Sequence, residues 1–222
     1  MIKKVLLPLL SIAVLTVGVV FAVSFQHKDK EKTQDSTPAK QTSMPVVESQ
    51  GLYETFDTAE SMQKEADLIV IASPKKTFEQ RKHVTTYLKG PNNERYPETT
   101  VTLTDVSIKK VLSSKKVSDK KLKSVTVIEY VGIFKDNDGV DKKLRFEGYE
   151  EMSEKQDYIL YLQKNDKGNY NIVNIINGKF ELKSQSKATK QSAIQQEHEA
   201  EHNYFNQQVK TKFKKELAEY TN

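Results

Sequence analysis

The sequence predicts an α+β domain in which a short helix, a small antiparallel β-barrel and a long C-terminal amphipathic helix follow one another. Short apolar runs rich in β-branched residues recur from 68 to 182, and Gly, Asn and Asp turns separate them. The longest run, 99–112, changes the parity of its apolar positions near Val106, which indicates a β-bulge of the kind that bends strands at barrel corners. The segment 184–220 lacks Gly and Pro, which favours a helix.

The elements are expected in a fixed order along the chain. Asp57 or Thr58 caps a short helix that ends near Ala66. The strand at 68–72 is apolar on both faces and continues through the polar stretch 76–88. Further strands are expected at 125–134, 144–146, 158–162 and 170–182, with turns at 90–93, 135–139 and 165–169 and a kink at Gly178.

The N-terminal segment predicts export. Lys3 and Lys4 precede an uncharged run, 5–26, that is long enough to cross about 30 Å of hydrocarbon as a helix. Lysines before such a run favour a cytoplasmic N-terminus, so we expect a single-pass membrane protein with its C-terminal domain outside the cell. The alternative is a signal peptide that is cleaved near Ser24, which gives a secreted protein. The predicted organisation is an anchor or signal peptide at 1–25, a flexible polar linker at 26–50, the barrel at 51–183 and the helix at 184–222.

Charge and composition narrow the class of partner. The chain of 222 residues carries a net charge of +5, and its only arginines are Arg81, Arg95 and Arg145. Because Arg is the preferred reader of bases and phosphates, no nucleic acid is expected. A Lys-rich surface fits a salt-sensitive attraction to anionic lipid or wall polymer, although it also serves solubility alone.

Cysteine is absent, which excludes a disulfide, a thiolate metal site and a thiol nucleophile. An abundance of Lys without Cys is typical of exported proteins of low-GC Gram-positive bacteria. The sequence contains no Walker loop, dinucleotide fingerprint or Ser-His-Asp order, and we expect no cofactor.

Four short motifs carry a resemblance. They are Ala-Asp-Leu-Ile-Val-Ile-Ala at 66–72, Lys-Lys-Val-Leu at 109–112, Tyr-Ile-Leu-Tyr-Leu at 158–162 and Gly-Lys-Phe-Glu-Leu at 178–182. In this order they resemble an extracytoplasmic bacterial domain with an OB-like barrel, which is distantly similar to netrin-like modules and to tissue inhibitors of metalloproteinases. The resemblance covers 58–182 and implies an OB-like barrel. Those inhibitors act through an N-terminal Cys that this chain lacks, so their mechanism is not carried over.

A cluster of lysines between two predicted strands is the candidate binding site. OB-like folds often bind ligands with such loops, and lysines near a membrane attract anionic lipid by about 1 kcal/mol each. The alternative interpretation is a solvated turn. The candidate residues are Lys109, Lys110, Lys115, Lys116, Lys120, Lys121 and Lys123.

The C-terminal segment contains an H-E-x-x-H motif. His198 and His202 lie four residues apart on a helix and can share a zinc ion, with Glu199 as general base and Glu216 or Glu219 as a third ligand. The polar flanks favour a solvated helix instead, whose apolar stripe packs on the barrel in its second half. That stripe comprises Phe205, Val209, Phe213 and Leu217.

These observations favour a non-enzymatic envelope protein, anchored in the membrane, that binds a protein, peptide or anionic polymer, with no catalytic residue assigned. Two alternatives stay open at this point. One is a zinc-dependent peptidase that uses His198, Glu199 and His202. The other is a structural or assembly protein that oligomerises through its C-terminal helix.

Overall fold

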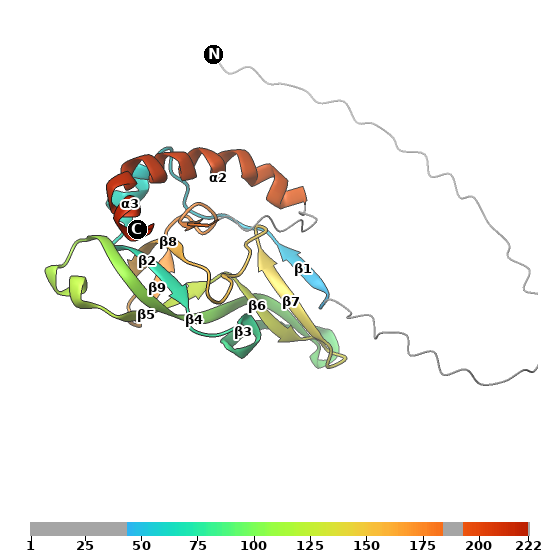
Figure 1. Cartoon of the computed structure of the whole chain (residues 1–222). Helices are drawn as coiled ribbons and strands as arrows, with labels where there is room; N and C mark the ends of the chain where they lie inside the picture. Colours follow the sequence, from blue (N-terminus) through green and yellow to red (C-terminus); the bar gives the residue numbers. More distant parts are fainter. Residues whose placement is uncertain (1–43, 184–192, 222) are drawn as a thin grey trace, which may run out of the picture. The chain divides into compact units, whose positions relative to one another are not determined.

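A computed structural model describes residues 44–183 and 193–221 (Figure 1). The predicted anchor or signal peptide at 1–25, linker residues 26–43 and the start of the C-terminal helix at 184–192 lie outside these ranges. Within the two ranges, no helix has the length and apolar character needed to cross a membrane.

Five strands close into the predicted barrel. Hydrogen bonding follows the order β2-β4-β5-β9-β8 and returns to β2. All neighbours are antiparallel except β5 and β9, which are parallel, and this arrangement is compatible with an OB-like barrel. The strands are β2 (Leu68–Pro74), β4 (Arg95–Ser114), β5 (Ser124–Glu129), β8 (Tyr158–Lys164) and β9 (Tyr170–Ile172).

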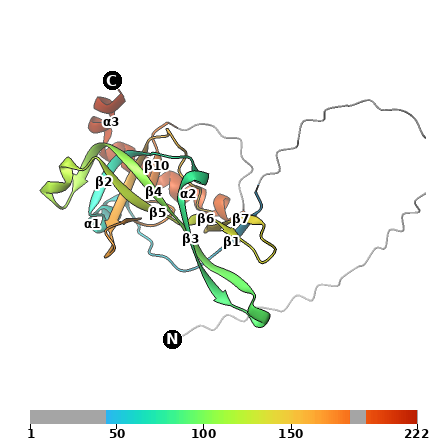
Figure 2. The ribbon, with the colours of Figure 1, turned by 90° about the horizontal axis from the view of Figure 1, so that it is seen from below.

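Further strands extend the barrel at its edges. β3 (Lys82–Lys89) pairs with the first half of β4 to form a hairpin arm, and β10 (Lys179–Glu181) pairs with β8. A second sheet has the order β1-β7-β6, in which β1 is Val46–Ser49, β7 is Asp141–Phe146 and β6 is Val131–Lys135. Figure 2 shows the hairpin arm projecting away from the barrel. Short 3-10 turns are η1 (Phe78–Gln80), η2 (Pro91–Asn93) and η3 (Val117–Lys121).

The folded domain begins earlier than expected, because β1 lies inside the segment 26–50 that was predicted as linker. Only four residues form β1, and they pair in parallel with β7, so that Val46 lies beside Lys143. A strand this short has no pattern of its own. Its partner is about a hundred residues further along the chain, which is why sequence reasoning missed it.

The predicted change of parity in β4 does not occur where it was expected. Thr100, Thr102, Thr104 and Val106 are all buried, so a single parity faces inward up to Val106. The register with β2 shifts instead towards the end of β4, between Ile69 and Val70 and again between Ile71 and Ala72. The bulges are therefore real, but they lie farther along β4.

The inward-facing positions of β4 were misassigned because threonines occupy most of them. Thr102 donates its hydroxyl to the carbonyl of Val131 at 2.6 Å, and Thr104 donates to the carboxylate of Glu129. A buried hydroxyl is tolerated when it is hydrogen-bonded. Polar residues therefore occupy interior positions that a hydrophobic pattern does not reveal.

Three other expected strands are divided. The stretch 76–88 is interrupted by η1 before β3, the run 125–134 breaks at Tyr130 into β5 and β6, and the run 170–182 becomes β9 and β10. The predicted kink at Gly178 lies between these last two strands. A Cβ on Gly178 would lie 1.9 Å from the carbonyl oxygen of Val173, so no other residue fits there.

The helices cover the outer face of the barrel strands. α1 (Ala59–Glu65) begins at the predicted cap, Thr58, which forms a capping box with Ser61. The long C-terminal helix is α2 (Ala193–Lys212), and it breaks at Phe213 before α3 (Lys214–Thr221). β2 is buried on both faces, as expected, because Leu68, Val70 and Ala72 face the barrel interior while Ile69 and Ile71 pack against the helices.

Candidate functional site

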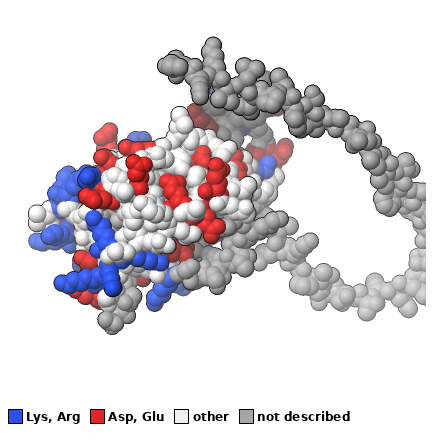
Figure 3. All heavy atoms as spheres, turned by 90° about the horizontal axis from the view of Figure 1, so that it is seen from above, with Lys and Arg blue, Asp and Glu red and all other residues white. Residues whose placement is uncertain are grey.

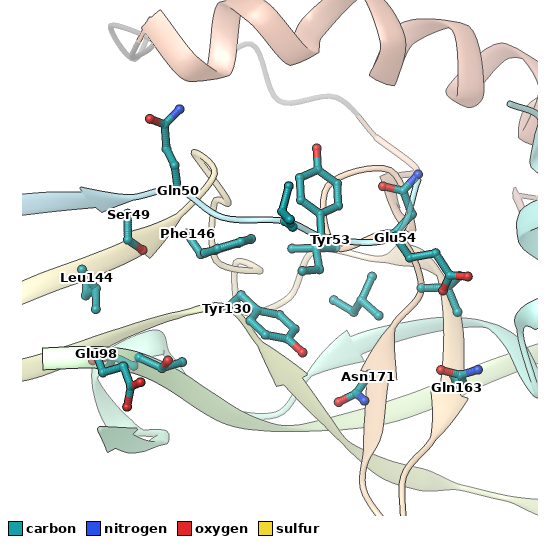
Figure 4. A pocket seen from close by; sticks show the side chains of 17 residues that line it. Ser49, Gln50, Tyr53, Glu54, Glu98, Tyr130, Leu144, Phe146, Gln163 and Asn171 are labelled. Carbon is teal, nitrogen blue, oxygen red and sulfur yellow. The ribbon is translucent and has the colours of Figure 1, made fainter. Parts of the chain in front are cut away.

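A groove of about 440 Å³ lies on the side of the barrel. The segment after β1, which carries Gln50, Tyr53 and Glu54, forms its upper wall, and Figure 4 shows this segment passing over the strands. Tyr130, Phe146 and Asn171 are labelled below it in the same view. The complete lining is Ser49, Gln50, Leu52, Tyr53, Glu54, Glu98, Thr99, Thr100, Tyr130, Leu144, Phe146, Gln163, Asn171, Ile172, Val173, Asn174 and Ile175.

A row of rings crosses this groove, which we call the aromatic groove. Tyr53 meets Phe146 edge-on with ring centroids 6.2 Å apart, and Tyr130 meets Phe146 at 6.1 Å. Tyr53 also contacts His198 of α2 at 6.4 Å. Such ring pairs are held in fixed orientations, and they offer flat apolar surface to a ligand.

The two tyrosines keep their hydroxyl protons. Burial raises the pKa of Tyr130, and burial together with Glu201 and Glu147 raises the pKa of Tyr53. Among the described lining residues there is no Lys or Arg, whereas Glu54 and Glu98 are present. The groove therefore presents hydrogen-bond donors without a positive charge, and it does not attract an anionic ligand.

Asn174 supplies a polar group that the fold leaves without a partner. Asn174 is only 4% exposed and lines the groove. Neither its side-chain oxygen nor its side-chain nitrogen is hydrogen-bonded. Its backbone is left-handed, with φ of 53°, a conformation that Asn tolerates better than most residues. A buried amide without partners costs about 1–3 kcal/mol. Both amide atoms are covered by surrounding groups, so a ligand in the groove bonds to them only when the Asn174 side chain turns outward.

No sequence signal pointed to the aromatic groove. Its lining comes from five separate stretches, near 49–54, 98–100, 130, 144–146 and 163–175, which meet only when the barrel and the β1-β7-β6 sheet have both formed. The one local hint is Leu52, an apolar residue within a polar stretch, whose side chain is fully exposed beside the groove.

The predicted lysine cluster occupies the end of β4 and the turn between β4 and β5, at the end of the molecule opposite β1 and β7 in Figures 1 and 2. Two of its members are engaged within the domain. Lys110 binds Glu219 of α3 at 3.0 Å, and Lys115 lies 3.4 Å from Asp67. The remaining five are exposed and form no ion pair with any described residue: Lys109, Lys116, Lys120, Lys121 and Lys123.

The histidines of the H-E-x-x-H motif face the barrel, contrary to the solvated helix that we favoured. They line a second hollow of about 390 Å³ beneath α2. His198 lies 3.4 Å from the Glu147 carboxylate, and His202 stacks on Phe180 with centroids 5.2 Å apart. The first half of α2 is therefore packed on the domain as well as the second.

The surroundings of His202 are those of a neutral imidazole. Burial, together with Lys179 and Lys210, lowers its pKa to about 4, although a hydrogen bond to the Ile176 backbone opposes this shift. In the described part of the chain, no three His, Cys, Asp or Glu side chains are grouped so as to hold a metal. Two glutamates were predicted as possible third ligands. Glu219, on α3, forms an ion pair with Lys110 of β4, and neither Glu219 nor Glu216 lines the hollow under α2.

The apolar stripe of the C-terminal helices is used within the domain. Phe205, Val209 and Phe213 are buried in a cluster with Ile69 and Tyr161, and Leu217 packs against it. This stripe is therefore already covered and does not present an apolar seam to a second chain.

Comparison of the chain with models of protein families, with curated proteins and with solved structures found no match.

Proposed function

We propose that this protein is a non-enzymatic, membrane-anchored envelope protein whose barrel domain binds an extended peptide segment of a partner in the aromatic groove. The observation that carries the proposal is the unpartnered amide of Asn174 in a groove that Tyr53 and Tyr130 also line. A side-chain amide offers one acceptor and two donors, which is the complement of a peptide bond.

The character of the groove favours a peptide over an anionic polymer. Its described lining has no cation to bind phosphate or sulfate, and Glu54 and Glu98 repel both. Its volume of about 440 Å³ falls within the range of small-ligand pockets, and its aromatic walls suit apolar side chains.

The extracytoplasmic setting rests on the sequence. The hydrophobic run after Lys3 and Lys4 and the motifs shared with OB-like extracytoplasmic domains support it. The closed five-stranded barrel agrees with the OB-like part of that resemblance, and the netrin-like outline remains part of the proposal.

A peptide library displayed on phage and selected against the full chain tests this function. Enriched peptides are synthesised, and their affinities are measured by fluorescence polarisation. Replacing Asn174 with Gly removes the amide but keeps the left-handed backbone accessible. We expect the Asn174→Gly variant to bind about tenfold more weakly, because about 1.4 kcal/mol of hydrogen bonding is lost.

The matched control is Asn92→Gly, the same change at a residue with φ of 57° in the turn of the hairpin arm, outside the groove. It should leave the affinity unchanged. Failure to enrich any peptide, or equal binding by both variants, contradicts a peptide site in the groove.

A further inference from the structure

The tip of the β4–β5 turn combines unpaired positive charge with an exposed apolar side chain. We call residues 115–123, together with Lys109 beside them, the basic tip. Val117 begins η3 and is 82% exposed, the largest exposed fraction among the apolar residues of the tip. Leu122 packs against the barrel core from the same turn, so the tip is held to the domain at its base.

The charge at the basic tip is strongly one-sided. Asp119 is its single acidic residue, and one of its carboxylate oxygens accepts a hydrogen bond from Ser114 at 3.1 Å. Lys116 shares a small hollow with Lys164 at the end of β8, where Asp67, Asp119 and Asp166 also lie, so the charge in that hollow is mixed and the excess of Lys lies on the rest of the tip. Five lysines of the tip remain unpaired among the described residues, as set out above.

The acidic side chains gather elsewhere. Figure 3 shows Lys and Arg side chains concentrated at the end of the molecule that carries the basic tip, whereas Asp and Glu side chains spread across the face covered by α2. An anionic surface therefore attracts one end of the domain and repels the helical face, which gives a preferred orientation.

We infer that the basic tip docks on the surface of a bilayer that contains anionic lipid, with Val117 in the interfacial region and the free lysines among the headgroup phosphates. Val117 decides between a bilayer and a soluble polyanion, because only a bilayer offers an apolar environment to a side chain at the end of a turn. The inference is independent of the peptide groove, since the two sites share no residue.

The strength of this contact follows from the number of lysines. Each Lys close to an anionic membrane raises the partition coefficient about fivefold. Neutralising two of them should lower it about 25-fold. Because the Debye length is about 10 Å at 0.1 M salt, added salt should weaken the contact in parallel.

The test uses the full chain reconstituted into vesicles, with one environment-sensitive fluorophore. The protein has no Cys, so Val117→Cys gives a single site for a nitrobenzoxadiazole label. Val140→Cys is the matched control, because Val140 is an exposed valine, 48% accessible, in the β6–β7 turn at the opposite end of the domain. Vesicles consist of phosphatidylcholine alone or of phosphatidylcholine and phosphatidylglycerol in equal parts.

We expect the emission of the label at 117 to shift to the blue only with phosphatidylglycerol, and the label at 140 to stay unchanged. The double change Lys120→Gln and Lys121→Gln in the basic tip should weaken docking about 25-fold. The same charge change at the exposed Lys82 and Lys89 of the hairpin arm should have little effect. Peptide affinity, measured on the same variants, should not move, so this inference and the proposed function fail separately.

Four results would overturn the inference. One is an equal shift with both kinds of vesicle, and another is an equal shift at both labelled positions. The third is a blue shift at 117 caused by inorganic polyphosphate without vesicles, which would identify a soluble polymer as the partner. Absence of any shift with phosphatidylglycerol has the same consequence.

Discussion

Two buried polar sites in this domain differ in how completely the fold satisfies them. Inside the barrel, the Arg81 guanidinium lies 2.8 Å from the Glu129 carboxylate, and both side chains are almost fully buried. Beside the groove, the amide of Asn174 is equally enclosed and has no partner. The two sites lie in one small domain, and they differ in whether the buried polar group has hydrogen-bond partners.

The Glu129 carboxylate is surrounded by donors. Besides Arg81, it accepts hydrogen bonds from the hydroxyls of Thr104 and Tyr149 and from the backbone N–H of Met152. The other N–H groups of Arg81 donate hydrogen bonds to backbone carbonyls, including that of Met152 at 2.7 Å. A buried charge with a full set of partners fixes structure, whereas a buried amide without partners gives the fold no hydrogen bond.

The largest predicted effect comes from breaking the buried pair. Arg81→Met alone, or Glu129→Leu alone, should lower the free energy of unfolding by about 3–5 kcal/mol, because each leaves an uncompensated buried charge. The double variant should be more stable than either single one. Urea unfolding followed by circular dichroism measures all three. Lys135→Met, which breaks the exposed pair with Asp141, is the control and should cost less than about 1 kcal/mol.

His202 is an intermediate case, with one backbone partner and a pKa lowered to about 4 by burial. Its folded pKa lies below the unfolded value, so between the two the unfolded state binds more protons and stability rises with pH. The full contribution is present above about pH 6.5, and up to about 3 kcal/mol is lost as the pH falls towards 4. Unfolding free energies measured across this range should show the loss in the parent chain and a smaller slope in His202→Phe. An unchanged slope in that variant would refute the assignment.

A single hydroxyl tests how strictly the Glu129 site is satisfied. Thr104→Val keeps the shape of the side chain but removes a hydrogen bond to the carboxylate. Hydrogen bonds to charged groups contribute about 1.5–3 kcal/mol, and the loss of unfolding free energy should fall in that range. Thr86→Val on the exposed hairpin arm, where the hydroxyl meets a backbone carbonyl in solvent, should change stability much less.

The smallest effect on stability is expected at the groove. Asn174→Gly relieves the cost of an unpartnered buried amide, and the greater flexibility of Gly in the unfolded chain opposes this gain, so the free energy of unfolding should fall by less than about 1 kcal/mol. The same urea measurement applies. A loss as large as that of Thr104→Val would mean that Asn174 holds the fold together, and the contrast between the two sites would disappear.

Much of the fold could be predicted from local chemistry. Thr58 begins α1 as expected, and the continuous apolar run of β2 indicated burial on both faces. The hairpin turn at 165–169 is also confirmed, with Asn165 accepting from Gly168 and donating to Asn169. These elements are defined by residues that are neighbours in sequence, so their patterns are visible without the fold.

The rest depended on contacts between distant residues. The orientation of His198 could not be predicted, because its neighbours in sequence are polar. The start of α2 contacts the connection between β7 and β8, where the Gln195 side chain donates a hydrogen bond to the carbonyl of Gly148. The inward threonines of β4 resemble surface residues until Glu129 is placed beside them. The aromatic groove has hardly any local pattern, because its walls come from both the barrel and the β1-β7-β6 sheet.

β4 links the two proposed sites as one continuous strand. Glu98 and Thr100 near its start line the groove, and Ser114 at its end adjoins the basic tip. The 14 residues of strand from Thr100 to Ser114 span at most roughly 46 Å at about 3.3 Å per residue, and less where β4 bends. A tip resting on lipid would therefore hold the groove several screening lengths above the headgroups, where a partner is chosen by its shape and hydrogen bonding rather than by the charge of the membrane below.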